Sequence, residues 1–106
     1  MPKYLLEVNY TVEGVRGLKA EGGSARVAAA TALVESLGGT VDSFHFALGE
    51  TDAYVIIDMP DAVSAAAGAL AVNAGGGATV RTIALLTAAE ADAAAAKKSL
   101  YRPPGK

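Results

Sequence analysis

The stretch TVDSFHFALGETDAYVIIDM, residues Thr40 to Met59, decides the fold because it predicts an antiparallel hairpin. Apolar and polar side chains alternate in its first part, as they do in a strand that has one buried face. One face carries Phe44, Phe46 and Leu48, and the other carries Val41, Ser43, His45 and Ala47. The run AYVIIDM then predicts the returning strand.

The connecting turn sets the expected pairing of these two strands. Gly49 to Asp52 form the turn, so Leu48 is expected to pair with Ala53. Phe46 then lies opposite Val55 on a strongly apolar face. A shift of one residue would exchange the two faces, because successive side chains of a strand point to opposite sides.

The chain before the hairpin predicts a strand and a helix. Residues 3 to 11 alternate, with Leu6, Val8 and Tyr10 on one face and Leu5, Glu7 and Asn9 on the other. Residues 12 to 23 contain several glycines and form either a short helix or an ordered loop. Ser24 is expected to cap a firmer helix, which ends at Gly38 and Gly39.

The chain after the hairpin predicts a helix, a strand and a last helix. Asp61 can cap a helix of small residues that reaches about Asn73, and the glycines 75 to 77 end it. Residues 78 to 86 read as a fourth strand. Thr87 and Glu90 match a capping box, and the helix that they begin is expected to reach about Ser99. Residues 100 to 106 contain two prolines and predict an extended tail.

This order of elements predicts an α+β fold of the βαββαβ type, with a four-stranded antiparallel sheet and an added C-terminal helix. Helices cover one face of such a sheet. The other face would carry leucine, isoleucine, valine and tyrosine, and in water it would expose a large apolar patch. Two sheets packed face to face would cover it, which predicts a dimeric α+β barrel.

Composition limits the function classes. The chain of 106 residues suits one domain, assigned to residues 1–99, followed by the tail 100–106. Its net charge of −2 and scattered basic residues argue against nucleic acid as a partner. Cysteine is absent, which excludes disulfides and thiolate metal sites. No apolar run approaches the length of a membrane span, so we expect no membrane partner and a cytoplasmic location.

Several separated segments resemble the GYD-domain family of small bacterial and archaeal proteins. They are YLLEVNYTVEGVRGL, ALGETDAYVIIDMPD, VRTIALLTAAEAD and the closing YRPPG. The resemblance covers nearly the whole chain. It implies a ferredoxin-like, dimeric α+β-barrel fold and a homodimer or higher homo-oligomer, but no particular reaction.

The family signature places glycine, tyrosine and aspartate in the central turn. This chain reads Gly49-Glu50-Thr51-Asp52, so Thr51 stands where the resemblance implies a tyrosine. Glu50 and Asp52 form either an acid/base or cation-binding pair, or the polar part of a structural turn. Two carboxylates are too few for a Ca²⁺ or Mg²⁺ site, and we predict no metal.

The remaining candidate residues lie on the expected strands. His45, the single histidine, is either a partly buried imidazole or a proton shuttle in a pocket. Asn9, Tyr10 and Arg81 would join His45 and Asp52 in a ligand site, or Arg81 would pair with an acid on a neighbouring strand. The sequence does not show that these five side chains converge.

No cofactor motif and no complete catalytic constellation is present in the sequence. We therefore expect a non-enzymatic, homo-oligomeric protein that is able to hold a small molecule. The alternative is a small cofactor-independent enzyme of the monooxygenase or isomerase type, using His45 together with Asn9 or Asp52. A cavity of a few hundred Å³ beside His45 would favour the enzyme.

Overall fold

A computed structural model describes residues 1–106 and shows one antiparallel sheet with the strand order β2-β3-β1-β4. The strands are β1 Lys3–Tyr10, β2 Thr40–Phe46, β3 Ala53–Asp58 and β4 Ala78–Leu85. The helices are α1 Val12–Glu21, α2 Gly23–Ser36, α3 Ala62–Ala74 and α4 Ala88–Ala96. This four-stranded α+β architecture confirms the predicted fold class and is consistent with a ferredoxin-like fold.

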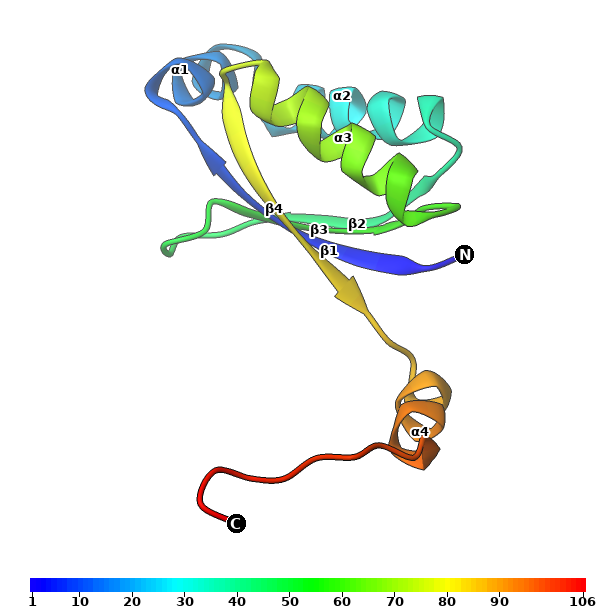
Figure 1. The fold of residues 1–106 in the computed structure, drawn as a ribbon. Coiled ribbons are helices and arrows are strands. Elements are labelled where there is room, and N and C mark those ends of the chain that lie inside the picture. The colour runs from blue at the N-terminus through cyan, green and yellow to red at the C-terminus, as the bar shows by residue number, and fades with distance from the viewer.

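Helices α1, α2 and α3 lie together on one face of the sheet, whereas α4 lies on the other side and away from it (Figure 1). We call the face covered by the three helices the covered face and the opposite one the open face. The two central strands, β1 and β3, pair along Lys3–Val8. Alternation along these strands therefore decides which side chains enter the core.

The core lies between the covered face and helices α2 and α3. Its nine buried residues are Tyr4, Val8, Val34, Ala53, Val55, Ile57, Met59, Ala65 and Ala78. Many of these side chains are small, which lets the helices approach the sheet closely but buries little area for each residue. Only 11 of the 106 residues are buried in the single chain.

The hairpin that the sequence predicts is present, but its register differs by two residues. Phe46 pairs with Ala53 and Phe44 pairs with Val55, because the connection runs over residues 47 to 52 rather than over four residues. Leu48 does not pair with Ala53 and is fully exposed. A shift of two keeps each side chain on its predicted face, since the faces repeat every second residue.

A β-bulge places Val41 on the face of the sheet opposite to the predicted one. The register shifts between Val41 and Ser43, so the extra residue Asp42 reverses the alternation. Val41 therefore pairs with Ile57 and packs against the core instead of sharing a face with Ser43. Uniform alternation along the whole strand does not predict such a bulge, because the bulge interrupts the two-residue period.

The helix boundaries follow local capping chemistry. Residues 12 to 21 form a helix rather than a loop, and the Thr11 side chain caps its start. Ser24 does not cap α2, because α2 already begins at Gly23. Gly22, with a φ of 87°, interrupts the helical conformation between α1 and α2. Asp61 caps α3 as predicted, and its carboxylate accepts the Ser64 N–H at 2.7 Å.

Helix α4 and the C-terminal tail extend away from the rest of the chain (Figure 1). The predicted capping box is present, but α4 ends at Ala96, three residues before the predicted end at Ser99. Every residue from Leu86 to Lys106 is exposed. The radius of gyration is 16.8 Å, compared with about 13 Å for a typical domain of this length.

No helix combines the length and apolar character that crossing a membrane would need.

Candidate functional site

The signature turn is held to the end of β1 by hydrogen bonds. Asp52 Oδ2 accepts the backbone N–H of Tyr10 at 2.9 Å, and the Asp52 N–H donates to the carbonyl of Val8 at 2.9 Å. The Asn9 amide donates to the carbonyl of Glu50 at 2.7 Å. These contacts join residues about forty positions apart, and they position the loop rather than a ligand.

The carboxylates of this turn therefore have different surroundings. The Asp52 carboxylate accepts a hydrogen bond from a backbone N–H, whereas Glu50 is exposed to solvent. Thr51, at the position of the signature tyrosine, is buried with 6% exposure. Gly49 is not among the glycines with positive φ, so the turn does not require a glycine there for its backbone conformation. A structural role accounts for the contacts of Asp52 in this turn.

The open face carries a polar row across all four strands. His45 pairs with Tyr54 across β2 and β3, and Glu7 on β1 pairs with both Tyr54 and Arg81 on β4. Arg81 Nη2 lies 2.9 Å from Glu7 Oε2, so this arginine pairs with an acid on a neighbouring strand. The structure thus aligns His45 and Arg81 in one row, with two residues between them.

A second row, next to the polar one, is apolar in its centre. Leu5 on β1 pairs with Ile56 on β3 and with Ile83 on β4. Ile83 is 39% exposed in the single chain, and Tyr54 in the neighbouring row is 42% exposed. We call the side chains of Leu5, Ile56 and Ile83 the apolar patch of the open face, and Tyr54 borders it.

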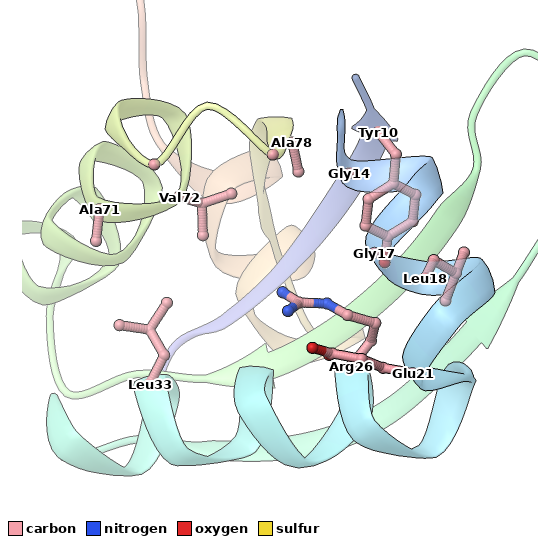
Figure 2. Close-up of a pocket in the computed structure, with 12 residues that line it drawn as sticks. Tyr10, Gly14, Gly17, Leu18, Glu21, Arg26, Leu33, Ala71, Val72 and Ala78 are labelled. Carbon is pink, nitrogen blue, oxygen red and sulfur yellow. The ribbon is translucent and has the colours of Figure 1, made fainter. Parts of the chain in front are cut away.

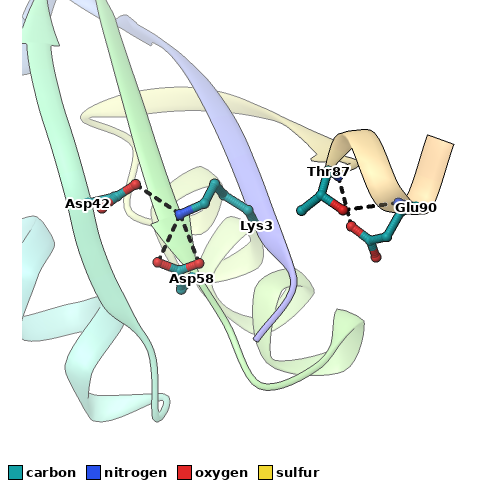
Figure 3. A network of polar contacts seen from close by, with 5 residues as sticks. All are labelled: Lys3, Asp42, Asp58, Thr87 and Glu90. Carbon is teal, nitrogen blue, oxygen red and sulfur yellow. Dashed lines mark hydrogen bonds and ion pairs between the residues drawn. The ribbon is translucent and has the colours of Figure 1, made fainter. Parts of the chain in front are cut away.

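An ion-pair network, drawn in Figure 3, lies at the other side of the apolar patch, because the pair of Lys3 and Asp58 follows the pair of Leu5 and Ile56 on the same face of the sheet. Lys3 Nζ lies 2.9 Å from Asp42 Oδ2 and 3.0 Å from Asp58 Oδ1. Hydrogen bonds to Asp42 and then to Asp58 raise the pKa of Lys3 above its ordinary value. The same view shows the capping box, in which Glu90 accepts the Thr87 N–H at 2.9 Å. Charged groups therefore lie on both sides of the apolar patch.

The covered face forms the wall of a cleft of about 450 Å³ between α1, α2 and the end of α3 (Figure 2). Apolar residues such as Leu33 and Val72 supply half of its twelve lining residues. Tyr10 and Arg26 contribute a phenol and a guanidinium, and Figure 2 shows both side chains directed into the cleft. This size lies within the range of small-molecule sites, which is roughly 300–1,000 Å³.

The polar groups of this cleft influence each other. Burial raises the pKa of the Tyr10 phenol above its ordinary value, and the charge of the nearby Arg26 acts in the opposite direction. No carboxylate oxygen lies within 4.0 Å of Arg26, since the ion pairs of the chain involve only Lys3 and Arg81 as cations. The cleft thus contains a cation without an ionic partner.

The structure does not bring the five predicted ligand residues together. Tyr10 lines the cleft on the covered face, whereas His45 and Arg81 belong to the open face. Asn9 and Asp52 make hydrogen bonds between the signature turn and β1. No group of three or more histidine, cysteine, aspartate or glutamate side chains is arranged to hold a metal ion.

Arg26 is not among the site residues that the sequence predicts, although it lines the cleft. It lies in the first turns of α2, and its neighbours in the cleft come from β1, α1 and the loop before β4. No spacing in the sequence connects these segments. The weak signal is that glycines at positions 14 and 17 of α1 leave one helix face without side chains, which opens space beside α2.

Comparison with known proteins connects this architecture to a family. A family model described as the GYD domain matches residues 4–95, which include the sheet except for Lys3 and all three covering helices. Neither the comparison with curated proteins nor that with solved structures gives a match. The matched range contains both the signature turn and the cleft. The chain therefore belongs to the GYD domain family.

Proposed function

We propose that the protein is a non-enzymatic homo-oligomer that assembles through the open face of its sheet and holds a small ligand in the cleft on the covered face. The apolar patch is the observation that carries the assembly. Leu5, Ile56 and Ile83 lie side by side across three strands, and none of the helices α1 to α3 covers them. Apolar side chains gathered in this way mark interaction surfaces.

A second copy of the chain is the occupant that best fits this face. The patch lies between the row of His45, Tyr54, Glu7 and Arg81 and the network around Lys3, and each contains both acidic and basic groups. A surface with charges of both signs around an apolar centre can pair with its own copy, because an isologous interface presents the same surface twice. The few buried residues of the single chain support the same conclusion.

Helix α4 and the tail add a second argument for assembly. They extend to the side of the open face, and none of their residues is buried (Figure 1). Leu100 and Tyr101 are exposed large apolar side chains at 106% and 76%. An exposed segment with apolar residues would gain stability by packing on a neighbouring copy, and we propose that it acts as an arm on that copy.

The assembly is tested by light scattering on the intact chain and two matched variants. Ile83→Lys places a charge in the apolar patch, and Val63→Lys places the same charge on the outer surface of α3, where Val63 is 80% exposed. At micromolar concentration, we expect the wild type to have a molar mass that corresponds to more than one copy of the chain. Ile83→Lys should dissociate it, because an unpaired charge would be buried in the interface, and Val63→Lys should not.

The same measurement can contradict the proposal. A wild-type chain that is monomeric at micromolar concentration would exclude assembly through the open face. An Ile83→Lys variant that keeps the wild-type mass would show that the copies meet elsewhere. A circular dichroism spectrum of each variant shows whether the fold is kept, so unfolding is distinguished from dissociation.

One observation favours the alternative, a small cofactor-independent enzyme of the oxygenase or isomerase type. His45, Tyr54, Glu7 and Arg81 lie in one row, and a second sheet over the open face would enclose them. Asn9 and Asp52 do not support the enzyme as partners of His45. The Asn9 side chain bonds to the signature turn, and the Asp52 side chain bonds to β1. A crystal structure of the oligomer decides: a cavity of several hundred Å³ beside His45 favours the enzyme, and a filled interior contradicts it.

A further inference from the structure

We propose that the cleft on the covered face binds a small monocarboxylate with an apolar body, and that Arg26 holds the carboxylate. This inference rests on the ligand-holding part of the proposed function and names the ligand chemistry. It is independent of assembly, because the cleft and the open face lie on opposite sides of the sheet.

The charge of the cleft favours an anion. Arg26 has no carboxylate within 4.0 Å, and Figure 2 shows its guanidinium directed into the cleft from α2. A guanidinium can donate two parallel hydrogen bonds to a carboxylate, which makes this the anion that it matches best. The Tyr10 hydroxyl, on the same cleft, can donate a further hydrogen bond.

The charged lining residues also favour an anion with one negative charge over an anion with two. Glu21 lines the same cleft, and its carboxylate would repel a ligand with two negative charges. Phosphate carries more than one charge near neutral pH in part of its population and has no apolar part. Six of the twelve lining residues are hydrophobic, so the ligand should fill most of the cleft with carbon.

The walls of the cleft are held in place before any ligand binds. The Thr11 N–H donates to the carbonyl of Gly77 at 3.1 Å, and the Thr11 hydroxyl donates to the carbonyl of Gly76 at 2.9 Å. A side chain at Gly14 would collide with the Gly77 carbonyl, so this close approach requires glycine. A rigid site loses little conformational entropy when a ligand binds.

Benzoate is the probe, because it combines one carboxylate with an apolar ring, and benzamide is its neutral match. Both are titrated into the ¹⁵N-labelled intact chain while the amide signals of Gly14, Gly75 and Gly77 are followed by NMR. Benzoate should shift these signals in a saturable way at concentrations up to about 20 mM, because a ligand of this size typically reaches only a Kd of roughly 1 mM. Benzamide should bind at least about tenfold more weakly, since it lacks the charge-assisted hydrogen bonds.

Two variants test the residues, and one serves as the control. Arg26→Gln should reduce benzoate affinity at least about tenfold, to that of benzamide. Gly17→Leu should abolish binding by filling the cleft, and space is open there because an added Cβ would meet nothing within 4 Å. Arg16→Gln removes the same charge from an exposed position of α1 outside the lining, and it should leave affinity unchanged.

The inference is overturned if benzoate does not shift these signals, or if benzamide binds as well as benzoate. It is also overturned if Arg26→Gln or Gly17→Leu keeps wild-type affinity, or if inorganic phosphate shifts the same signals at lower concentration than benzoate. Light scattering on the same samples separates the two proposals. An oligomer that does not bind benzoate contradicts the ligand inference alone, and a monomer that binds it contradicts the assembly alone.

Discussion

The two faces of the sheet share the same strands but differ in what covers them. Ile57 and Ile56 are neighbours on β3, yet Ile57 is 3% exposed beneath the helices and Ile56 lies on the open face. The covered face buries its apolar side chains within one chain. The open face has apolar side chains of the same kind and no element of its own chain to cover them.

This difference suggests that the two faces serve different purposes. The covered face supplies the stability of the single chain and includes a cleft with an unpaired arginine. The open face has alternating ionic and apolar rows, which suits recognition of a second copy. In the proposed assembly, changes on the covered face act at every protein concentration. Changes on the open face would depend on protein concentration, because they would act through the proposed oligomer.

The largest effect is expected from a matched pair of truncations on β3. Ile57→Ala should lower the free energy of unfolding by about 3 kcal/mol, because it leaves a cavity in the core. Ile56→Ala should have an effect that grows with protein concentration, since the proposed oligomer would bury its side chain and the single chain does not. Urea unfolding of both variants at two protein concentrations measures this difference.

Equal, concentration-independent losses for both variants would remove the distinction between the faces. A loss of less than about 0.5 kcal/mol for Ile56→Ala at both concentrations would show that the open face stays in water.

A smaller effect is expected at the signature turn, which is hydrogen-bonded to the end of β1. Asp52→Ala removes the acceptor for the Tyr10 N–H and should lower the free energy of unfolding by about 1–2 kcal/mol. Glu50→Ala is the matched control, because only the backbone carbonyl of Glu50 is used by Asn9. Urea unfolding compares them. Equal stability of the two variants would contradict the structural role of Asp52.

The smallest effect on stability is expected from a fall in pH. It should differ between α3, which packs on the covered face, and α4, which lies on the side of the open face. The Ser64 backbone N–H, followed by the Ser64 hydroxyl, holds the pKa of Asp61 below its ordinary value of 3.8. The Thr87 backbone N–H likewise holds the pKa of Glu90 below its ordinary value of 4.5. Because the pKa of each capping carboxyl is lower in the folded than in the unfolded chain, each cap stabilises the fold fully at a pH above the pKa of the unfolded chain. This contribution is lost as the pH falls through the lowered pKa.

The two helices should therefore respond differently below about pH 4. Protonation of Asp61 should lower global stability, because α3 packs on the sheet and contributes Ala65 to the core. Protonation of Glu90 should loosen only α4, which buries none of its residues. Amide hydrogen exchange of α3 and α4 as a function of pH tests this. Loss of protection in both helices at the same pH would contradict it.

Much of the fold could be predicted from particular residues. Alternation placed Leu6, Val8 and Tyr10 on the covered face, and the capping chemistry of Asp61 and of Thr87 with Glu90 located two helix starts. The hairpin register was wrong because turn length alone does not determine it. Hydrogen bonds from Asn9 and Tyr10 hold a longer loop against β1, and these contacts form between distant parts of the chain.

The sequence by itself determined the order of the strands, the two faces of β1 and of the later part of β2, and the membership of the family, because these depend on local periodicity and motifs. The tertiary structure alone decided that Tyr10 and Arg26 share a cleft while His45 and Arg81 lie on the opposite face. It also decided that α4 leaves the body of the chain. The physical reason is that such placements arise from packing between segments far apart in sequence, which no local pattern encodes.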